Sequence, residues 1–135
     1  GYWKRPDESK KAFNKDGYFR TGDYATINAK GYVKILDRKK DMILVSGFNV
    51  FPNEIEAVLM LHPDIVEAAA IAIPYPDSGE AVKVFIVKRT DSLTEKIVNT
   101  YCRKQLTAYK CPKEIVFMDE LPKSNVGKVL RKNLR

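Results

Sequence analysis

The sequence predicts an α+β fold in which a small sheet is flanked by helices and preceded by a short β-rich segment. From residue 42 onward, runs of β-forming residues and helical patterns follow the order strand, helix, strand, strand, helix, strand. A length of 135 residues with 44% hydrophobic side chains suffices for one substantial core. Turn signals separate the elements, and no repeat or low-complexity tract occurs.

Residues 17–36 are expected to form two antiparallel strands. Turn signals at Asp16-Gly17 and Lys30-Gly31 bracket the first extended run, and a second run of β-forming residues follows. Residues 37–41 are all charged. Because burying such a run is costly, we expect all of it to lie on the surface, at a position suited to joining two bodies.

The run 42–45 predicts a short strand, and residues 46–51 predict a loop in which Gly47 permits backbone angles that other residues resist. Pro52 suits the first position of a helix, and apolar residues at helical spacing follow it. We expect His62-Pro63 to end this helix.

The second half of the chain is expected to continue the alternation of strands and helices. Ser92 and Glu95 form a capping-box pattern, which predicts the start of a helix. Cys102 falls at the apolar spacing of this helix and is therefore expected to be an unreactive core residue. The remaining expectations are strands over 65–73, 81–87 and 114–118, a loop over 74–79 and a polar loop over 121–128.

Composition excludes several classes of site. The chain has two cysteines, no CxxC pair and a single histidine, so we expect no metal site, no disulfide scaffold and no triad that needs a second histidine. No run approaches the length of a membrane-spanning helix, and no stretch resembles a secretory signal. We therefore expect a cytoplasmic protein, with peripheral contact at the inner face of the membrane left open.

The formal charge of +7 is unevenly distributed along the chain. Residues 1–40 carry eleven Lys and Arg against five Asp and Glu, residues 41–122 carry eight against twelve, and residues 123–135 carry five against none. Basic ends suit nucleic acid, anionic lipid or a phosphate-rich ligand, and they equally suit a solvated face with no partner.

Three segments have compositions that suggest chemistry. In residues 19–23, a glycine beside Asp23 lets a carboxylate approach a ligand hydroxyl, although a strand-ending turn with Asp23 as a cap explains the segment as well. Residues 37–51 place a charged run before a glycine loop, which is also typical of a linker and a β-turn. In residues 122–128, Gly127 frees the backbone beside Lys128, which suits contact with a phosphate or carboxylate but also plain solvation.

Taken in order, these segments resemble the C-terminal portion of the adenylate-forming acyl-CoA synthetase superfamily, and are most similar to bacterial long-chain fatty acid–CoA ligases. The resemblance covers nearly the whole chain. The motifs that carry it are YFRTGD (18–23), DRKKDMI (37–43), SGFNV (46–50) with PNEIE (52–56), and PKSNVGK (122–128).

The resemblance implies a two-lobe enzyme in which a fatty acid and Mg²⁺-ATP form acyl-AMP and pyrophosphate, after which CoA displaces AMP. It implies that Asp23 holds the ribose hydroxyls of ATP or AMP and that Arg38 lies near the ribose or phosphate. By the same resemblance, Lys40 takes the hinge position and Gly47 lines the passage for the pantetheine arm of CoA. Lys128 would be the catalytic lysine that bridges the substrate carboxylate and the α-phosphate.

The family pattern also implies a division of the chain. Residues 1–40 would be the C-terminal end of the large adenylation lobe, with a hinge at about residue 40, and residues 41–135 would be the mobile C-terminal lobe. The family's Gly-, Ser- and Thr-rich ATP loop and its acyl pocket do not occur in these residues. We therefore expect an inactive piece of a longer protein, whose large lobe binds most of the ATP, Mg²⁺, CoA and fatty acid.

Two kinds of alternative remain open. Within the enzyme class, an aryl-CoA ligase and a peptide-synthetase adenylation domain share much of this pattern. From another class, a free-standing basic module would bind nucleic acid or an anionic membrane. We expect no nucleic-acid partner. Aromatic and basic residues do not interleave on one strand face, and the acidic residues of the segment 41–122 interrupt the continuous basic surface that such binding needs. Steeply salt-dependent binding to a random oligonucleotide would favour the module.

Overall fold

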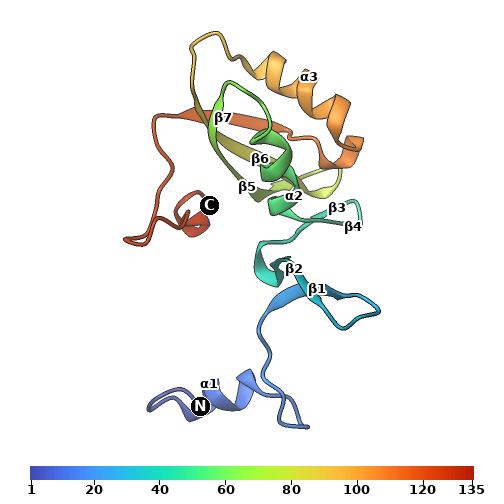
Figure 1. The fold of residues 1–135 in the computed structure, drawn as a ribbon, viewed down its shortest axis with the longest axis vertical. Helices are drawn as coiled ribbons and strands as arrows, with labels where there is room; N and C mark the ends of the chain where they lie inside the picture. The colour runs from blue at the N-terminus through green and yellow to red at the C-terminus, as the bar shows by residue number, and fades with distance from the viewer. The chain divides into compact units, whose positions relative to one another are not determined.

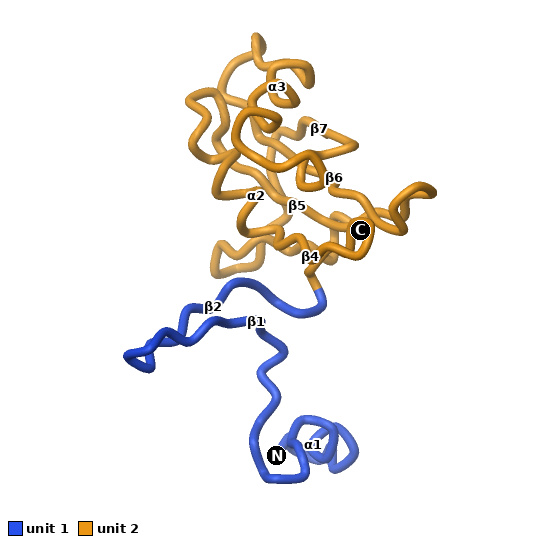
Figure 2. Tube along the Cα trace, turned by 90° about the vertical axis from the view of Figure 1, so that its right-hand side faces the viewer, with its two compact units in different colours: residues 1–40 blue, residues 41–135 orange.

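The computed structural model describes residues 1–135, which divide into two compact units (Figure 1). Unit 1 comprises residues 1–40 and unit 2 comprises residues 41–135 (Figure 2). Neither unit has a helix with the length and apolar character that crossing a membrane requires.

Unit 1 contains one short helix and one antiparallel pair of strands. The helix α1 (Pro6–Ala12) has proline and then acidic residues in its first turn and two lysines in its last turn, so its charges complement the helix dipole. The strands β1 (Asp23–Ile27) and β2 (Val33–Arg38) are the two expected between residues 17 and 36. The turn between them is closed by the side chain of Asn28, which accepts hydrogen bonds from the backbone N–H groups of Lys30 and Tyr32.

Unit 2 is built on a mixed five-stranded sheet, which confirms the α+β fold. The longest pair, β5 with β6, is antiparallel, whereas β7 runs parallel to β6 on its other side. A short hairpin, β3 with β4, joins the sheet where Val45 pairs with Gly79. The strands are β3 (Ile43–Val45), β4 (Phe48–Val50), β5 (Ile65–Tyr75), β6 (Gly79–Lys88) and β7 (Glu114–Met118).

The two helices of unit 2 cover one face of this sheet. The helix α2 (Pro52–Leu59) contributes Ile55 and Leu59 to the core, and α3 (Glu95–Gln105) contributes Val98 and Cys102. Alternate residues of β5 and β6 face the opposite side, where a second apolar cluster includes residues of the C-terminal segment. The members of this second cluster are Ala69, Ile71, Phe85, Leu121 and Leu134.

Several boundaries differ from the sequence predictions. The expected loop over 74–79 shrinks to a turn because β5 continues to Tyr75 and β6 begins at Gly79. The expected loop over 46–51 contains β4. The helix α3 is capped by Thr94, whose side-chain oxygen accepts from the N–H of Ile97, because the hydroxyl of Ser92 is instead hydrogen-bonded to that of Thr90.

The prediction that residues 37–41 all lie on the surface was wrong. Asp37 is 2% exposed and Asp41 is 7% exposed, while the three basic residues between them are exposed. Each buried carboxylate has a polar partner: Asp37 accepts from the backbone N–H of Arg38, and Asp41 pairs with two arginines of the C-terminal segment. These partners offset the cost of removing the charges from water.

Candidate functional site

Asp23 and Arg38 face each other at one end of the β1–β2 pair. The strand register places them directly opposite, and Nε of Arg38 lies 3.2 Å from Oδ1 of Asp23. A terminal guanidinium nitrogen of Arg38 also donates to the backbone carbonyl of Thr21 at 3.2 Å. The hydroxyl of Thr21 accepts from the backbone N–H of Asp23 at 3.1 Å. Unit 1 therefore presents a carboxylate in a fixed orientation beside a half-exposed guanidinium.

Gly47 lies at the tip of the β3–β4 hairpin. Its φ is +84° and that of the preceding Ser46 is +50°, the pair of positive angles that a two-residue turn between right-twisted strands requires. The N–H of Ser46 donates to the carbonyl of Ser78, which ties the hairpin to the β5–β6 turn. A Cβ atom added at Gly47 would have no atom within 4 Å. The glycine thus permits the backbone angles of the turn, and the space beside its Cα atom is open.

A cavity of about 300 Å³ lies beside this hairpin. Its lining includes Ser46, Tyr75, Tyr109, Cys111 and Lys113. The ring of Tyr109 stacks on that of Phe48, with 4.7 Å between their centroids. The cavity therefore combines aromatic faces with one ammonium group.

Lys40 occupies the middle of a single 3-10 turn, η1 (Lys39–Asp41), at the last position of unit 1. Within unit 1, the N–H of Lys39 donates to the carbonyl of Gly22 at 2.8 Å. The backbone from Lys40 to Asp41 is the covalent connection between the units.

Lys128 is exposed on a tight loop of the C-terminal segment. The loop is closed by a bridge between Lys123 and Val129, and the N–H of Ser124 donates to the carbonyl of Lys128 at 2.9 Å. The hydroxyl of Ser124 accepts from the N–H of Lys128 at 3.2 Å. Gly127, with φ of +77°, makes the reversal. The ammonium group of Lys128 forms no ion pair, so its charge is available to a ligand.

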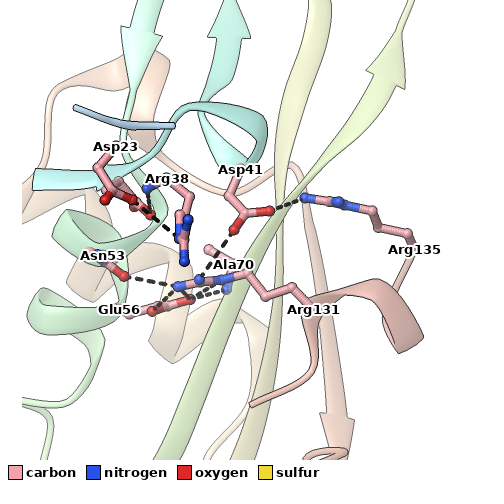
Figure 3. A network of polar contacts seen from close by, with 9 residues as sticks. Asp23, Arg38, Asp41, Asn53, Glu56, Ala70, Arg131 and Arg135 are labelled. Atoms are coloured by element: carbon pink, nitrogen blue, oxygen red, sulfur yellow. Dashed lines mark hydrogen bonds and ion pairs between the residues drawn. The ribbon is translucent and has the colours of Figure 1, made fainter. Parts of the chain in front are cut away.

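Sequence reasoning missed a network of ion pairs between side chains that joins the two ends of unit 2. Figure 3 shows Arg131 between Glu56 and Asn53 on one side and Asp41 on the other, with Arg135 reaching Asp41 from the same segment. The only signal in the sequence was the excess of basic residues after residue 122. Because the partners lie far away along the chain, that signal could not assign them.

Among residues 1–135, no group of three or more His, Cys, Asp or Glu side chains is placed to hold a metal ion. Cys102 is fully buried, as expected, and burial raises the pKa of its thiol to about 11. Of the sequence-predicted site residues, Asp23 and Arg38 are in direct contact, whereas Gly47 and Lys128 lie on separate loops of unit 2.

The sequence matches known proteins over its whole length. A family model described as the AMP-binding enzyme C-terminal domain matches residues 54–128. The chain is 58% identical over 135 residues to the long-chain-fatty-acid–CoA ligase of Escherichia coli O6:H1, with 100% of the chain and 24% of that relative covered. It is 40% identical over 134 residues to the long-chain-fatty-acid–CoA ligase FadD13 of Mycobacterium tuberculosis, with 99% and 26% covered. The chain thus spans about a quarter of the length of these relatives.

A solved structure shares the fold. The crystal structure of ATP-bound MatB from Rhodopseudomonas palustris superposes with a TM-score of 0.93 at 40% sequence identity, covering 100% of this chain and 27% of that chain.

Proposed function

Because the chain belongs to the AMP-binding enzyme C-terminal domain family, among the acyl-CoA ligases of the adenylate-forming superfamily, we propose that it forms part of a fatty acid–CoA ligase. Residues 41–135 act as the mobile lobe, and residues 1–40 are the end of the large lobe. The large lobe is the main partner and supplies the ATP loop and the acyl pocket.

The proposed reaction has two halves. The carboxylate of a fatty acid attacks the α-phosphorus of ATP, which forms acyl-AMP and releases pyrophosphate. The thiol of CoA then attacks the acyl carbon, which forms the thioester and releases AMP. The small lobe turns about Lys40 between the two half-reactions, so that different residues of the lobe face the reacting groups in each of them.

The proposed nucleotide contacts are Asp23 and Arg38. A carboxylate accepts hydrogen bonds from two ribose hydroxyls, and the guanidinium that holds it lends positive charge near the phosphates. The 3.2 Å between Nε of Arg38 and Oδ1 of Asp23 supports this assignment, because the guanidinium orients the carboxylate before any ligand arrives. The half-exposed guanidinium keeps donors free for a ligand.

The observation that carries the proposal is the placement of Lys128, an exposed and unpaired ammonium group on a loop whose backbone is closed by internal hydrogen bonds. A positive charge there can stabilise the negative charge that shifts between carboxylate and α-phosphate in the first half-reaction. It has no part in the second half-reaction. Gly47, which borders open space beside a cavity, takes the pantetheine arm in the second half-reaction.

A chimera tests this function. Residues 1–135 would replace the matched segment of the Escherichia coli relative, and two activities would be measured: fatty-acid-dependent exchange of pyrophosphate into ATP, and thioester formation from supplied acyl-AMP and CoA. Lys128→Ala should slow the first activity by roughly 10²–10³-fold and leave the second near its normal rate. Lys132→Ala removes a neighbouring exposed lysine and should change neither activity.

The outcomes are distinct. An inactive chimera, or equal loss of both activities on substitution of Lys128, would overturn the proposed role. Pyrophosphate exchange by residues 1–135 alone would contradict the dependence on a large lobe.

A further inference from the structure

The guanidinium of Arg131 is the centre of the ionic network in unit 2. Its side chain is 17% exposed, and it contacts three polar side chains that come from two separate parts of the chain (Figure 3). From α2, Glu56 accepts from Nε and Nη2, and Asn53 accepts from Nη2 at 2.9 Å. From η1, Asp41 lies 3.8 Å from Nη1.

Each of these partners is itself held in place. Oε1 of Glu56 also accepts the backbone N–H of Ala70 on β5, at 2.8 Å. Asp41 is buried and also pairs with Arg135. The guanidinium therefore binds side chains that are held in place by α2, β5 and the start of unit 2. Because these partners are fixed, the planar guanidinium adopts a single orientation.

Arg131 follows closely after the loop that carries Lys128. The backbone between them is short: the carbonyl of Pro122 accepts from the N–H of Leu130, and η3 (Arg131–Asn133) begins at the next residue. On the other strand of the loop, Lys123 pairs with Glu67. The two strands of the Lys128 loop are thus pinned to the sheet and to α2 by separate ion pairs.

We propose that Arg131 is a positioning residue for Lys128. Its ion pairs to Glu56 and Asp41 fix the position and orientation of the Lys128 loop relative to the sheet and α2, as acyl-adenylate formation requires. This inference rests on the proposed function. All members of the network belong to unit 2, so the loop keeps its place within the lobe when the lobe turns about Lys40. Arg131 does not touch substrate; it acts through Lys128.

The test uses the chimera described above and three substitutions. Arg131→Met removes the charge and the hydrogen bonds, Arg131→Lys keeps the charge but loses the fork, and Lys132→Met removes an adjacent exposed charge as the matched control. Arg131→Met should slow pyrophosphate exchange by about 10²-fold, the effect of a small misplacement of a catalytic group. Thioester formation from supplied acyl-AMP should stay near normal, and Lys132→Met should alter neither activity.

A second measurement separates positioning from folding. If Arg131 acts only through Lys128, adding Arg131→Met to Lys128→Ala should slow pyrophosphate exchange no further, because the interaction it serves is already gone. Independent, multiplicative losses would overturn the proposal. So would equal losses in both half-reactions, or no loss in either.

The variants keep the test decisive. If the Met variant fails to fold, Arg131→Lys is judged by the same split between half-reactions, with an intermediate loss of pyrophosphate exchange expected. An inactive unsubstituted chimera would reject the proposed function itself, whereas an active chimera whose Arg131 variants show no split would reject only the positioning role.

Discussion

The guanidinium of Arg131 binds both carboxylate oxygens of Glu56, with Nη2 lying 2.9 Å from Oε1 and 2.7 Å from Oε2. The same carboxylate accepts the backbone N–H of Ala70, so one acidic side chain connects α2, β5 and the C-terminal segment. Three elements of unit 2 therefore share a single, largely buried charge.

The first prediction concerns this charge. Glu56→Gln keeps the shape of the side chain but turns an amide group toward the guanidinium, and should lower the free energy of unfolding by roughly 1–3 kcal/mol. Urea unfolding of residues 1–135, followed by circular dichroism, measures the shift in midpoint. Glu120→Gln is the matched control, because Glu120 is exposed. Equal midpoints for the two variants would show that the network adds nothing to stability.

The second prediction concerns Gly47. At φ of +84°, any side chain adds about 1–2 kcal/mol of backbone strain, but nothing within 4 Å would clash with a Cβ atom. Gly47→Ala and Gly47→Leu should therefore add the same backbone strain but differ in the size of the side chain. In the chimera, we expect Gly47→Leu to stop thioester formation while pyrophosphate exchange survives, and Gly47→Ala to retain much of both. Equal effects of the two variants would attribute the loss to strain and not to a blocked passage.

The third prediction concerns the hinge at Lys40. Lys40 lies in a 3-10 turn, and Lys40→Pro fixes its φ at about −65° and so removes the backbone freedom that a hinge uses. We expect one half-reaction to persist and the other to fail in the chimera, with pyrophosphate exchange as the survivor. Lys40→Ala, which removes the charge without fixing φ, is the control and should retain both. Loss of exchange in the proline variant would mean that the turn had been disrupted.

The fourth prediction concerns the thiols. Burial raises the pKa of Cys102 from its ordinary value of 9.0 to about 11, and burial also raises the pKa of the half-buried Cys111. Iodoacetamide should therefore modify Cys111 slowly at neutral pH and should leave Cys102 unmodified until the chain unfolds, as peptide mass spectrometry would reveal. Rapid modification of Cys102 under native conditions would contradict its burial.

The same shift has a consequence for stability. Because the folded state holds the Cys102 proton more tightly than the unfolded chain, the stabilising contribution is complete below pH 9.0 and is lost as the pH rises toward 11. The loss of stability over that range should be smaller in Cys102→Ala than in the unsubstituted chain. An identical pH dependence would rule out the contribution of this thiol.

The sequence was most informative where local chemistry decides the structure. Runs of β-forming residues located β5, β6 and β7, and Pro52 located the start of α2. The cap of α3 was misplaced because Ser92 and Thr94 are both good capping residues, and the hydroxyl of Ser92 is hydrogen-bonded to that of Thr90, two residues earlier. The strand β4 was missed because a run of three residues beside a glycine carries no clear period.

The candidate site was predictable only in part. Asp23 and Arg38 could be named from motifs, yet their direct contact depends on the register of β1 with β2. The burial of Asp41 was not predictable, because its carboxylate is buried against cations from another segment. Those cations, Arg131 and Arg135, lie at the far end of unit 2, and no local pattern relates them to residue 41.

The ion pair between Asp41 and Arg135 has a topological consequence. It brings the first residue of unit 2 beside residue 135, so the path of the chain through the unit is nearly a ring. When the two ends of a chain meet in this way, its fold does not require the termini to lie at one particular position. A permuted polypeptide in which a short flexible linker joins residue 135 to residue 41, and in which new ends are cut in the exposed turn at residues 90–92, should therefore reach the same fold.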